Sequence, residues 1–255
     1  MDEQRIWLLT GTGEGPPLAA ELLSRGWQLR VSVVSSAAAR AYPQHPALEL
    51  HVGALGDQDA VQRTLSQWPC RWVVDAAHPF AKSIHPAIAK ACRALNQPWL
   101  RLQRPMLASH HATLLPQLEA LADLPLEHDS LLLALGARQL ALALGYSRAR
   151  EHAVRLLPSA SALGQALQLG LPAERIACLR PQTNLTLEGS VEAGLCRRWG
   201  ITAVLARQSG GPPERQWHQI CQAMGLKLLL LARPEPLDPS ALEMLPLLAR
   251  LGWPA

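Results

Sequence analysis

The fold is decided by the stretch Ile6-Trp7-Leu8-Leu9-Thr10-Gly11-Thr12-Gly13-Glu14-Gly15, where an apolar run breaks into a glycine-rich turn. The run is typical of a buried parallel strand that leads into a helix. Such a loop lets a phosphate approach the backbone, and the N-terminus of the next helix presents N–H groups to an anion. The spacing G-x-G-x-G falls short of the full G-x-G-x-x-G pattern, so a nucleotide-binding loop and an ordinary strand-to-helix turn are both open here.

The composition is that of a globular protein. Of 255 residues, 49% are hydrophobic and 17% are charged, which excludes an intrinsically disordered chain. Apolar runs are too short to span a membrane, and the N-terminus lacks the pattern of a secretory signal, so we expect a cytoplasmic protein. The net charge of +4 is spread along the chain, which argues against nucleic acid as a partner.

Neither a metal site nor a disulfide is indicated. The five cysteines are scattered without a C-x-x-C pair, so we expect them to be reduced. His110 and His111 are adjacent, but no third ligand stands at a helical or hairpin spacing from them. Most basic residues are arginines, which bind carboxylates and phosphates through paired hydrogen bonds. This bias fits a small polyanionic ligand, and a drift of the composition toward arginine explains it equally well.

The second expected strand, residues 27–34, is followed by small hydroxyl residues and a base. In dinucleotide-binding sheets an acid at this place binds the ribose of NAD, whereas a base accommodates the extra phosphate of NADP. Here the chain has Ser35, Ser36 and Arg40 without an acid, which favours NADPH over NADH if a dinucleotide binds. Gly53 ends the third expected strand at the same edge of the sheet.

The fourth expected strand, residues 71–75, continues into Ala76-Ala77-His78-Pro79-Phe80. Because the carboxyl ends of parallel strands share one edge, Asp75 and His78 are expected beside the first glycine loop. Pro79 restricts His78 to an extended backbone, which makes His78 a candidate proton donor or ligand contact. The alternative is that His78 and Phe80 only pack the turn.

The second half of the chain repeats the alternation of strand and helix. Residues 106–127 contain prolines and little periodicity, and we interpret them as a linker between domains 1–105 and 128–255. The pattern predicts an α/β protein of two Rossmann-like domains whose parallel sheets face one another across a cleft. An expected strand over 201–206 ends in Arg207-Gln208-Ser209-Gly210-Gly211, which suits an anion; a mobile turn is the alternative.

Seven segments occur in one order along nearly the whole chain: Leu9–Gly15, Val74–Ala81, Leu100–Pro105, Gly136–Leu140, Arg155–Pro158, Ser209–Gly211 and Arg233–Pro234. Together they resemble the precorrin-6A reductase family of cobalamin biosynthesis, which includes cobalt-precorrin-6A reductases. The pattern Asp-x-x-His-Pro-Phe-Ala is the most specific of them. The resemblance implies an NADPH-dependent oxidoreductase that reduces one double bond of the macrocycle, converting precorrin-6A or its cobalt form to the 6B form.

The resemblance also suggests roles for individual residues. The substrate carries many carboxylates, and we assign to it Arg104, Arg138, Arg207, Ser209, Gly210 and Gly211. We assign to the cofactor Gly11, Thr12, Gly13, Glu14, Gly15, Ser35, Ser36, Arg40, Gly53 and Pro79. His78 and Glu14 are the catalytic candidates. Because an acid beside a phosphate is unfavourable, we expect Glu14 at the ribose or nicotinamide end, or against the substrate.

Two other functions stay open at this point. One is a non-catalytic tetrapyrrole- or nucleotide-binding protein of the same fold. The other is a sugar-nucleotide transferase with two α/β domains, for which the chain has no obvious acidic metal motif. We expect a monomer or a weak homo-oligomer that acts on a small molecule.

Overall fold

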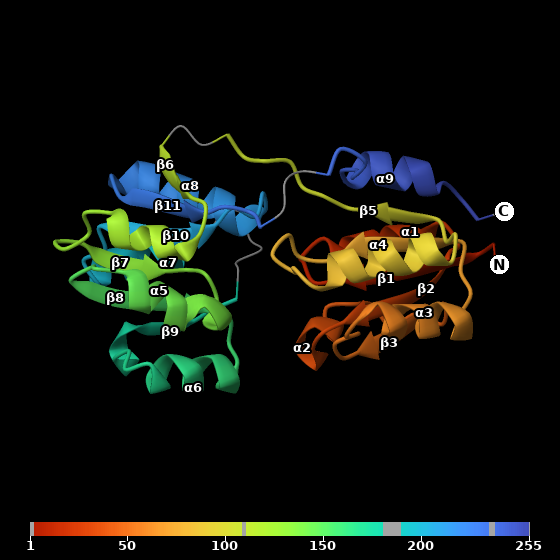
Figure 1. Ribbon diagram of the computed structural model, residues 1–255, viewed down its shortest axis with the longest axis horizontal. Coiled ribbons are helices and arrows are strands. Elements are labelled where there is room, and N and C mark those ends of the chain that lie inside the picture. The colour runs from red at the N-terminus through yellow and green to blue at the C-terminus, as the bar shows by residue number, and fades with distance from the viewer. Residues whose placement is uncertain (1–2, 109–110, 181–189, 235–237, 255) are drawn as a thin grey trace. The chain divides into compact units, whose positions relative to one another are not determined.

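A computed structural model describes residues 3–108, 111–180, 190–234 and 238–254 (Figure 1). The chain divides into two compact units, one formed by Met1–Pro105 with Pro234–Ala255 and the other by Met106–Arg233. Among the described residues, each unit contains one sheet with only parallel strands, and helices alternate with the strands along the chain. This confirms the predicted α/β class with two Rossmann-like sheets. The predicted cleft between them stays a prediction.

The sheet of the first unit has the strand order β3-β2-β1-β4-β5. This is the order of a dinucleotide-binding half, and its direction reverses between β1 and β4, where ligands bind beyond the carboxyl ends. The strands are β1 (Arg5–Thr10), β2 (Gln28–Val33), β3 (Leu48–Val52), β4 (Trp72–Ala76) and β5 (Trp99–Arg101). The helices are α1 (Gly15–Ser24), α2 (Ser36–Ala39), α3 (Gln58–Gln67), α4 (Ile84–Ala94) and α9 (Met244–Leu251).

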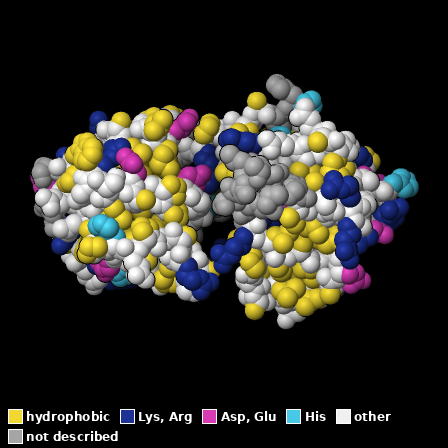
Figure 2. Space-filling view, turned by 180° about the vertical axis from the view of Figure 1, so that it is seen from behind, with side chains coloured by type: hydrophobic (Ala, Val, Ile, Leu, Met, Phe, Trp, Pro, Cys, Tyr) yellow, Lys and Arg dark blue, Asp and Glu magenta, His cyan; other side chains and the backbone are white. Residues whose placement is uncertain are grey.

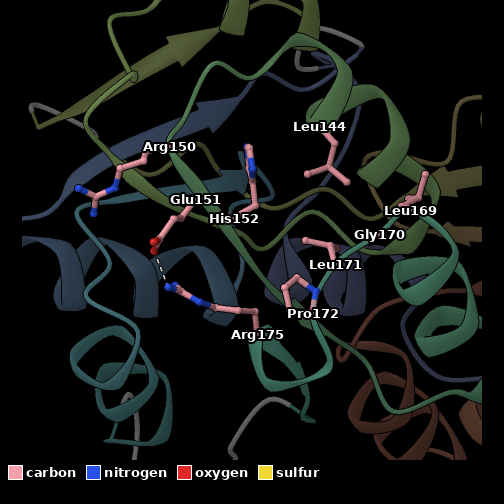
Figure 3. A pocket seen from close by; sticks show the side chains of 9 residues that line it. All are labelled: Leu144, Arg150, Glu151, His152, Leu169, Gly170, Leu171, Pro172 and Arg175. Atoms are coloured by element: carbon pink, nitrogen blue, oxygen red, sulfur yellow. Dashed lines mark hydrogen bonds and ion pairs between the residues drawn. The ribbon is translucent and has the colours of Figure 1, made fainter.

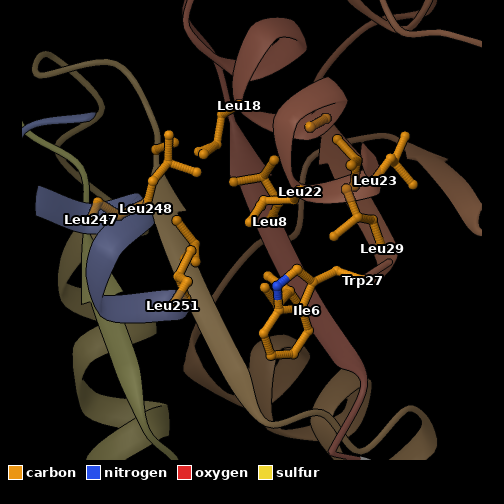
Figure 4. Close-up of a cluster of buried hydrophobic side chains, with 14 of the residues drawn as sticks. Ile6, Leu8, Leu18, Leu22, Leu23, Trp27, Leu29, Leu247, Leu248 and Leu251 are labelled. Carbon is orange, nitrogen blue, oxygen red and sulfur yellow. The ribbon is translucent and has the colours of Figure 1, made fainter. Parts of the chain in front are cut away.

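Strand β1 is buried on both faces, which explains its unbroken apolar run. Ile6 and Leu8 belong to a core shared with α1 and α9, whereas Trp7 and Leu9 belong to a second core with α3 and α4. Figure 4 shows the leucines of α9 beside those of α1 in the first of these cores. A strand covered by helices on both sides is apolar at every position instead of alternating.

The second unit repeats the same order and adds one strand. Its sheet runs β6-β11-β10-β7-β8-β9, so β7 and β10 flank its own point of reversal. The strands are β6 (Ala112–Leu115), β7 (Ser130–Leu133), β8 (Glu151–Leu156), β9 (Ile176–Cys178), β10 (Ala203–Arg207) and β11 (Lys227–Leu231). The α-helices are α5 (Leu140–Tyr146), α6 (Ala160–Gln168), α7 (Ser190–Arg198) and α8 (Pro212–Met224), and the 3₁₀ helices are η1 (Leu118–Asp123), η2 (Ala137–Gln139) and η3 (Ala173–Arg175).

The structure differs from the predicted domain boundaries in two places. Residues 106–127 are not only a linker, because β6 pairs in parallel with β11 and η1 buries Leu118 and Leu121. Residues 234–255 return to the first unit, where Leu242 bridges to Leu102 beyond β5. Both differences have one physical reason. The segments β6 and α9 pack against strands and helices that are distant from them in the sequence. His110 lies outside the described residues.

One face of the second unit carries exposed apolar side chains around α6. Figure 2 shows hydrophobic side chains gathered there, and Leu163, Leu167 and Leu169 are exposed. Within the described part of the chain, no helix is long and apolar enough to cross a membrane.

Candidate functional site

Tyr42 packs against the glycine loop after β1. Thr10 and Tyr42 share a buried hydrogen bond between their hydroxyl groups, and Gly15 lies directly against them. A Cβ added at Gly15 would lie 2.2 Å from the Tyr42 hydroxyl oxygen and 2.6 Å from Thr10 Oγ1. Burial raises the pKa of Tyr42, so its hydroxyl keeps its proton. At Gly13, by contrast, a Cβ would meet nothing within 4 Å.

The first turn of α1 offers fewer N–H donors than the sequence analysis expected. Pro16 and Pro17 occupy this turn and have no N–H. The N–H of Gly15 donates to the carbonyl oxygen of Thr12 at 3.3 Å, and that of Leu18 donates to Glu14. An anion at this loop must therefore be recognised by the backbone before Gly15 and by side chains. The aligned peptide dipoles of α1 still favour negative charge there.

Glu14 and Arg104 bind each other. The Glu14 carboxylate forms an ion pair with the Arg104 guanidinium, and both side chains are mostly buried. Burial raises the pKa of Glu14, but the hydrogen bond and charge of Arg104 outweigh it, so the pKa lies below its usual value. The sequence predicts Arg104 at the substrate, and Glu14 at the cofactor or against the substrate. Arg104, which lies three residues after β5, thus joins the segment after that strand to the glycine loop, and both assignments stay predictions.

The polar residues after β2 lie at the same carboxyl edge. Ser35 caps α2, and its Oγ accepts the N–H of Ala38 at 3.3 Å. Ser36 and Arg40 are exposed, and Gly53 follows β3 with its N–H bonded to the carbonyl oxygen of Val33 at 2.9 Å. Gly53 has a φ of 143°, a conformation that favours glycine. The carboxyl edge of the sheet next to β1 thus presents the hydroxyl groups of Ser35 and Ser36 and the guanidinium of Arg40.

The loop after β4 lies against the glycine loop. A Cβ at Gly11 would sit 3.5 Å from the backbone nitrogen of His78. Nδ1 of His78 accepts the N–H of Phe80 at 3.1 Å, so the ring proton lies on Nε2. The ring of His78 lies 5.8 Å from that of Phe80, centroid to centroid. Pro79 between them is half-buried.

Asp75 and His85 form a buried pair next to this loop, and the sequence did not predict their contact. Asp75 in β4 is 0% exposed, and its Oδ2 lies 2.6 Å from Nδ1 of His85 in α4. The sequence predicted Asp75 at this edge but gave His85 no role. The signal was weak, because ten positions separate the two residues and a histidine near the start of an amphipathic helix is unremarkable in sequence.

In the second unit Arg138 follows β7 and Arg207 ends β10, the two strands that flank the point of reversal. Gly136 follows β7 with a φ of 87°, and a Cβ there would lie 3.8 Å from Nη2 of Arg207 at the end of β10. Burial and the charge of nearby Arg138 lower the pKa of Arg207. Arginine at the carboxyl end of a parallel strand is a residue type that binds carboxylates and phosphates.

The Ser209-Gly210-Gly211 loop has an acid of its own. All three residues are buried, and the N–H of Gly210 donates to Oε2 of Glu214 at 2.5 Å. Glu214 stands in the first turn of α8, where Pro212 and Pro213 again lack N–H groups. The predicted anion cradle therefore has one donor already occupied. The sequence signal for this contact is the position of Glu214, three residues after the N-cap residue Gly211 of α8.

One cavity of the second unit lies at the other edge of its sheet. It has a volume of about 370 Å³ and is lined by residues at the amino ends of β8 and β9, with the ion pair of Glu151 and Arg175 on its wall (Figure 3). Ligands of parallel sheets bind beyond the carboxyl ends, where Arg138 and Arg207 stand. We therefore do not assign this cavity to the site.

Comparisons with known proteins agree with the geometry of the two sheets. The family model of "Precorrin-6x reductase CbiJ/CobK" matches residues 5–249. A cobalt-precorrin-6A reductase of Synechocystis sp. is 33% identical over 90% of this chain and 88% of its own length. A precorrin-6A reductase of Mycobacterium tuberculosis is 29% identical over 90% and 89%.

A solved structure has the same architecture. "CobK precorrin-6A reductase" superposes with a TM-score of 0.79 and 25% identity, covering 99% of both chains. The fold and the order of the sequence motifs thus agree over almost the whole length. The chain belongs to the precorrin-6x reductase CbiJ/CobK family and is an oxidoreductase of cobalamin biosynthesis.

Proposed function

We propose that this chain reduces precorrin-6A or cobalt-precorrin-6A to the 6B form with NADPH. The observation that carries the proposal is the contact of the glycine loop with the His78 loop where the strand order reverses. Ligands of such sheets bind at this place. The names of the relatives supply the substrate class, with both the metal-free and the cobalt form represented. A cytoplasmic location, supported by the composition, is part of the proposal.

The first unit fits a nicotinamide dinucleotide. The open space at Gly13 leaves room for a phosphate close to the backbone, while Ser35, Ser36 and Arg40 can bind the 2′-phosphate that distinguishes NADPH. When bound, the cofactor supplies the hydride. The chain's own task is then to orient the ring, for which the Nε2–H of His78 is a suitable donor, and to exclude competing reactions.

The preference for NADPH depends on Arg40. We expect Arg40→Ala to weaken NADPH binding about tenfold and to leave NADH binding unchanged, because a hydrogen bond to a charged group is lost. Titration of nicotinamide fluorescence measures both affinities. Arg63→Ala, an exposed arginine of α3, is the matched control. Equal losses for both cofactors would contradict the assignment of Arg40 to the 2′-phosphate.

The second unit is proposed to bind the carboxylates of the macrocycle. Arg138 is near enough to Arg207 to lower its pKa, and arginine binds a carboxylate through two parallel hydrogen bonds. Buried Ser209 stands two positions after Arg207 on the same loop.

Loss of Arg207 should therefore appear in substrate binding. We expect Arg207→Met to raise KM for the macrocycle about 10- to 100-fold, with little change in the Kd of NADPH. Arg215→Gln, an exposed arginine of α8, should change neither value. A raised Kd for NADPH with an unchanged KM for the macrocycle would mean that Arg207 belongs to the cofactor site.

The activity itself is tested by mixing the protein with NADPH and each form of the substrate. We expect a substrate-dependent loss of nicotinamide absorbance with at least one of them. No loss with either form, despite normal NADPH binding, would favour the alternative of a non-catalytic binding protein.

A further inference from the structure

A carboxylate and an imidazole are buried together beneath the His78 loop. Asp75 is fully buried in β4, and His85 is 4% exposed in the first turn of α4. Besides its 2.6 Å contact with Nδ1 of His85, the carboxylate accepts the N–H of Ala77 through Oδ1 at 3.1 Å. A buried carboxylate is strongly unfavourable unless it is paired and hydrogen-bonded. These two partners therefore make its position possible.

The second ring nitrogen of His85 faces the main chain of the loop. Nε2 lies 3.1 Å from the carbonyl oxygen of His78. A carbonyl oxygen has no proton to give, so Nε2 donates. A further proton lies between Nδ1 and Oδ2. The imidazole thus connects the carboxylate in the strand to the loop, which is held at the N–H of Ala77 and at the C=O of His78.

We propose that His85 and Asp75 are positioning residues of the reductase, which fix the main chain at Ala77 and His78 and thereby the direction of the His78 ring. The loop is the wall beside Gly11, so a shift of the loop displaces the donor at the point of reversal. The inference rests on the proposed role of His78 toward the cofactor. Neither residue of the pair touches the ligand in this account.

The test separates positioning from stability with a double variant. His85→Leu leaves the Asp75 carboxylate buried without its histidine, so its unfolding midpoint should fall. Asp75→Asn/His85→Leu removes that charge, so its midpoint should recover most of the loss. Its kcat should nevertheless stay about 10- to 100-fold low, because the His78 carbonyl oxygen keeps the N–H of Ala81 from its own turn, at 2.7 Å, but loses its link to α4. The Kd of NADPH should change by less than the kcat does.

Asp75→Asn alone is the conservative variant. Its amide can accept from Ala77 and donate to Nδ1 of a neutral His85, so we expect it to fold and to keep kcat within a few-fold. Lys90→Ala, on the exposed side of α4, is the control for the helix. The short Nδ1–Oδ2 contact should also give a far-downfield imidazole proton signal in the wild type, absent after His85→Leu.

Two outcomes would overturn the positioning role. One is a double variant that recovers kcat together with its stability, which means that the pair only stabilises the fold. The other is an Asp75→Asn variant that folds but loses kcat. This result would mean that turnover depends on the negative charge of Asp75 and not on its hydrogen bonds to the loop and to His85. A wild type that binds NADPH but turns over neither substrate would overturn the proposed function instead.

Discussion

Removal of residues 234–255 is expected to unfold the first unit, although these residues follow the whole second unit in sequence. Leu247, Leu248 and Leu251 of α9 are 0%, 7% and 3% exposed, and they complete the core over β1 and α1 (Figure 4). Arg25 donates from Nη1 to the carbonyl oxygen of Leu248 at 2.7 Å, and Trp27 donates from Nε1 to that of Gly252 at 3.1 Å. Without α9 this core would face water.

Single substitutions give the measurable form of this prediction. Leu247→Ala should lower the free energy of unfolding of the first unit by about 2–5 kcal/mol, because it leaves a cavity in a closed core. Leu245→Ala in the same helix should have little effect, since Leu245 is 78% exposed. Amide hydrogen exchange of Ile6–Leu9 reports on this unit alone. Similar losses for both variants would mean that α9 does not pack as described.

Gly15→Ala is expected to distort the glycine loop and to weaken cofactor binding. The new Cβ would lie 2.2 Å from the Tyr42 hydroxyl oxygen and 2.9 Å from Cβ of Thr10, so buried groups on two strands or loops must move. Overpacking of this kind typically costs about 1–3 kcal/mol. Thermal unfolding and NADPH titration measure the two effects. We expect both stability and affinity to fall.

Gly13→Ala is the matched control, because a Cβ there meets nothing within 4 Å and Gly13 has no positive φ. This variant should keep its stability and still lose affinity for NADPH, since the methyl group takes the space proposed for a phosphate. Stability that falls equally in both variants would contradict the packing at Gly15. Unchanged affinity after Gly13→Ala would remove Gly13 from the cofactor site.

Local sequence was sufficient for most of the first unit. The apolar run of β1, the glycine turn and the small residues after β2 predicted a parallel sheet with its functional loops at one edge, and the structure has that sheet. These features are local because burial on both faces makes a strand uniformly apolar and a tight turn requires glycine. The motifs that resemble the reductase family are local for the same reason, and the family is confirmed.

The glycine loop after β1 separates what neighbouring residues determine from what long-range contacts determine. The sequence by itself determined the strand, the turn and the start of α1, because each depends on neighbouring residues. Only the tertiary structure decided that Arg104 binds Glu14, that His85 reaches Asp75, that β6 joins β11 and that α9 returns to the first unit. These contacts join residues far apart in the chain or on different elements, and no periodicity or turn signal encodes them. They form because burying a charge requires a partner and an uncovered core or sheet edge requires a cover, whichever part of the chain supplies it.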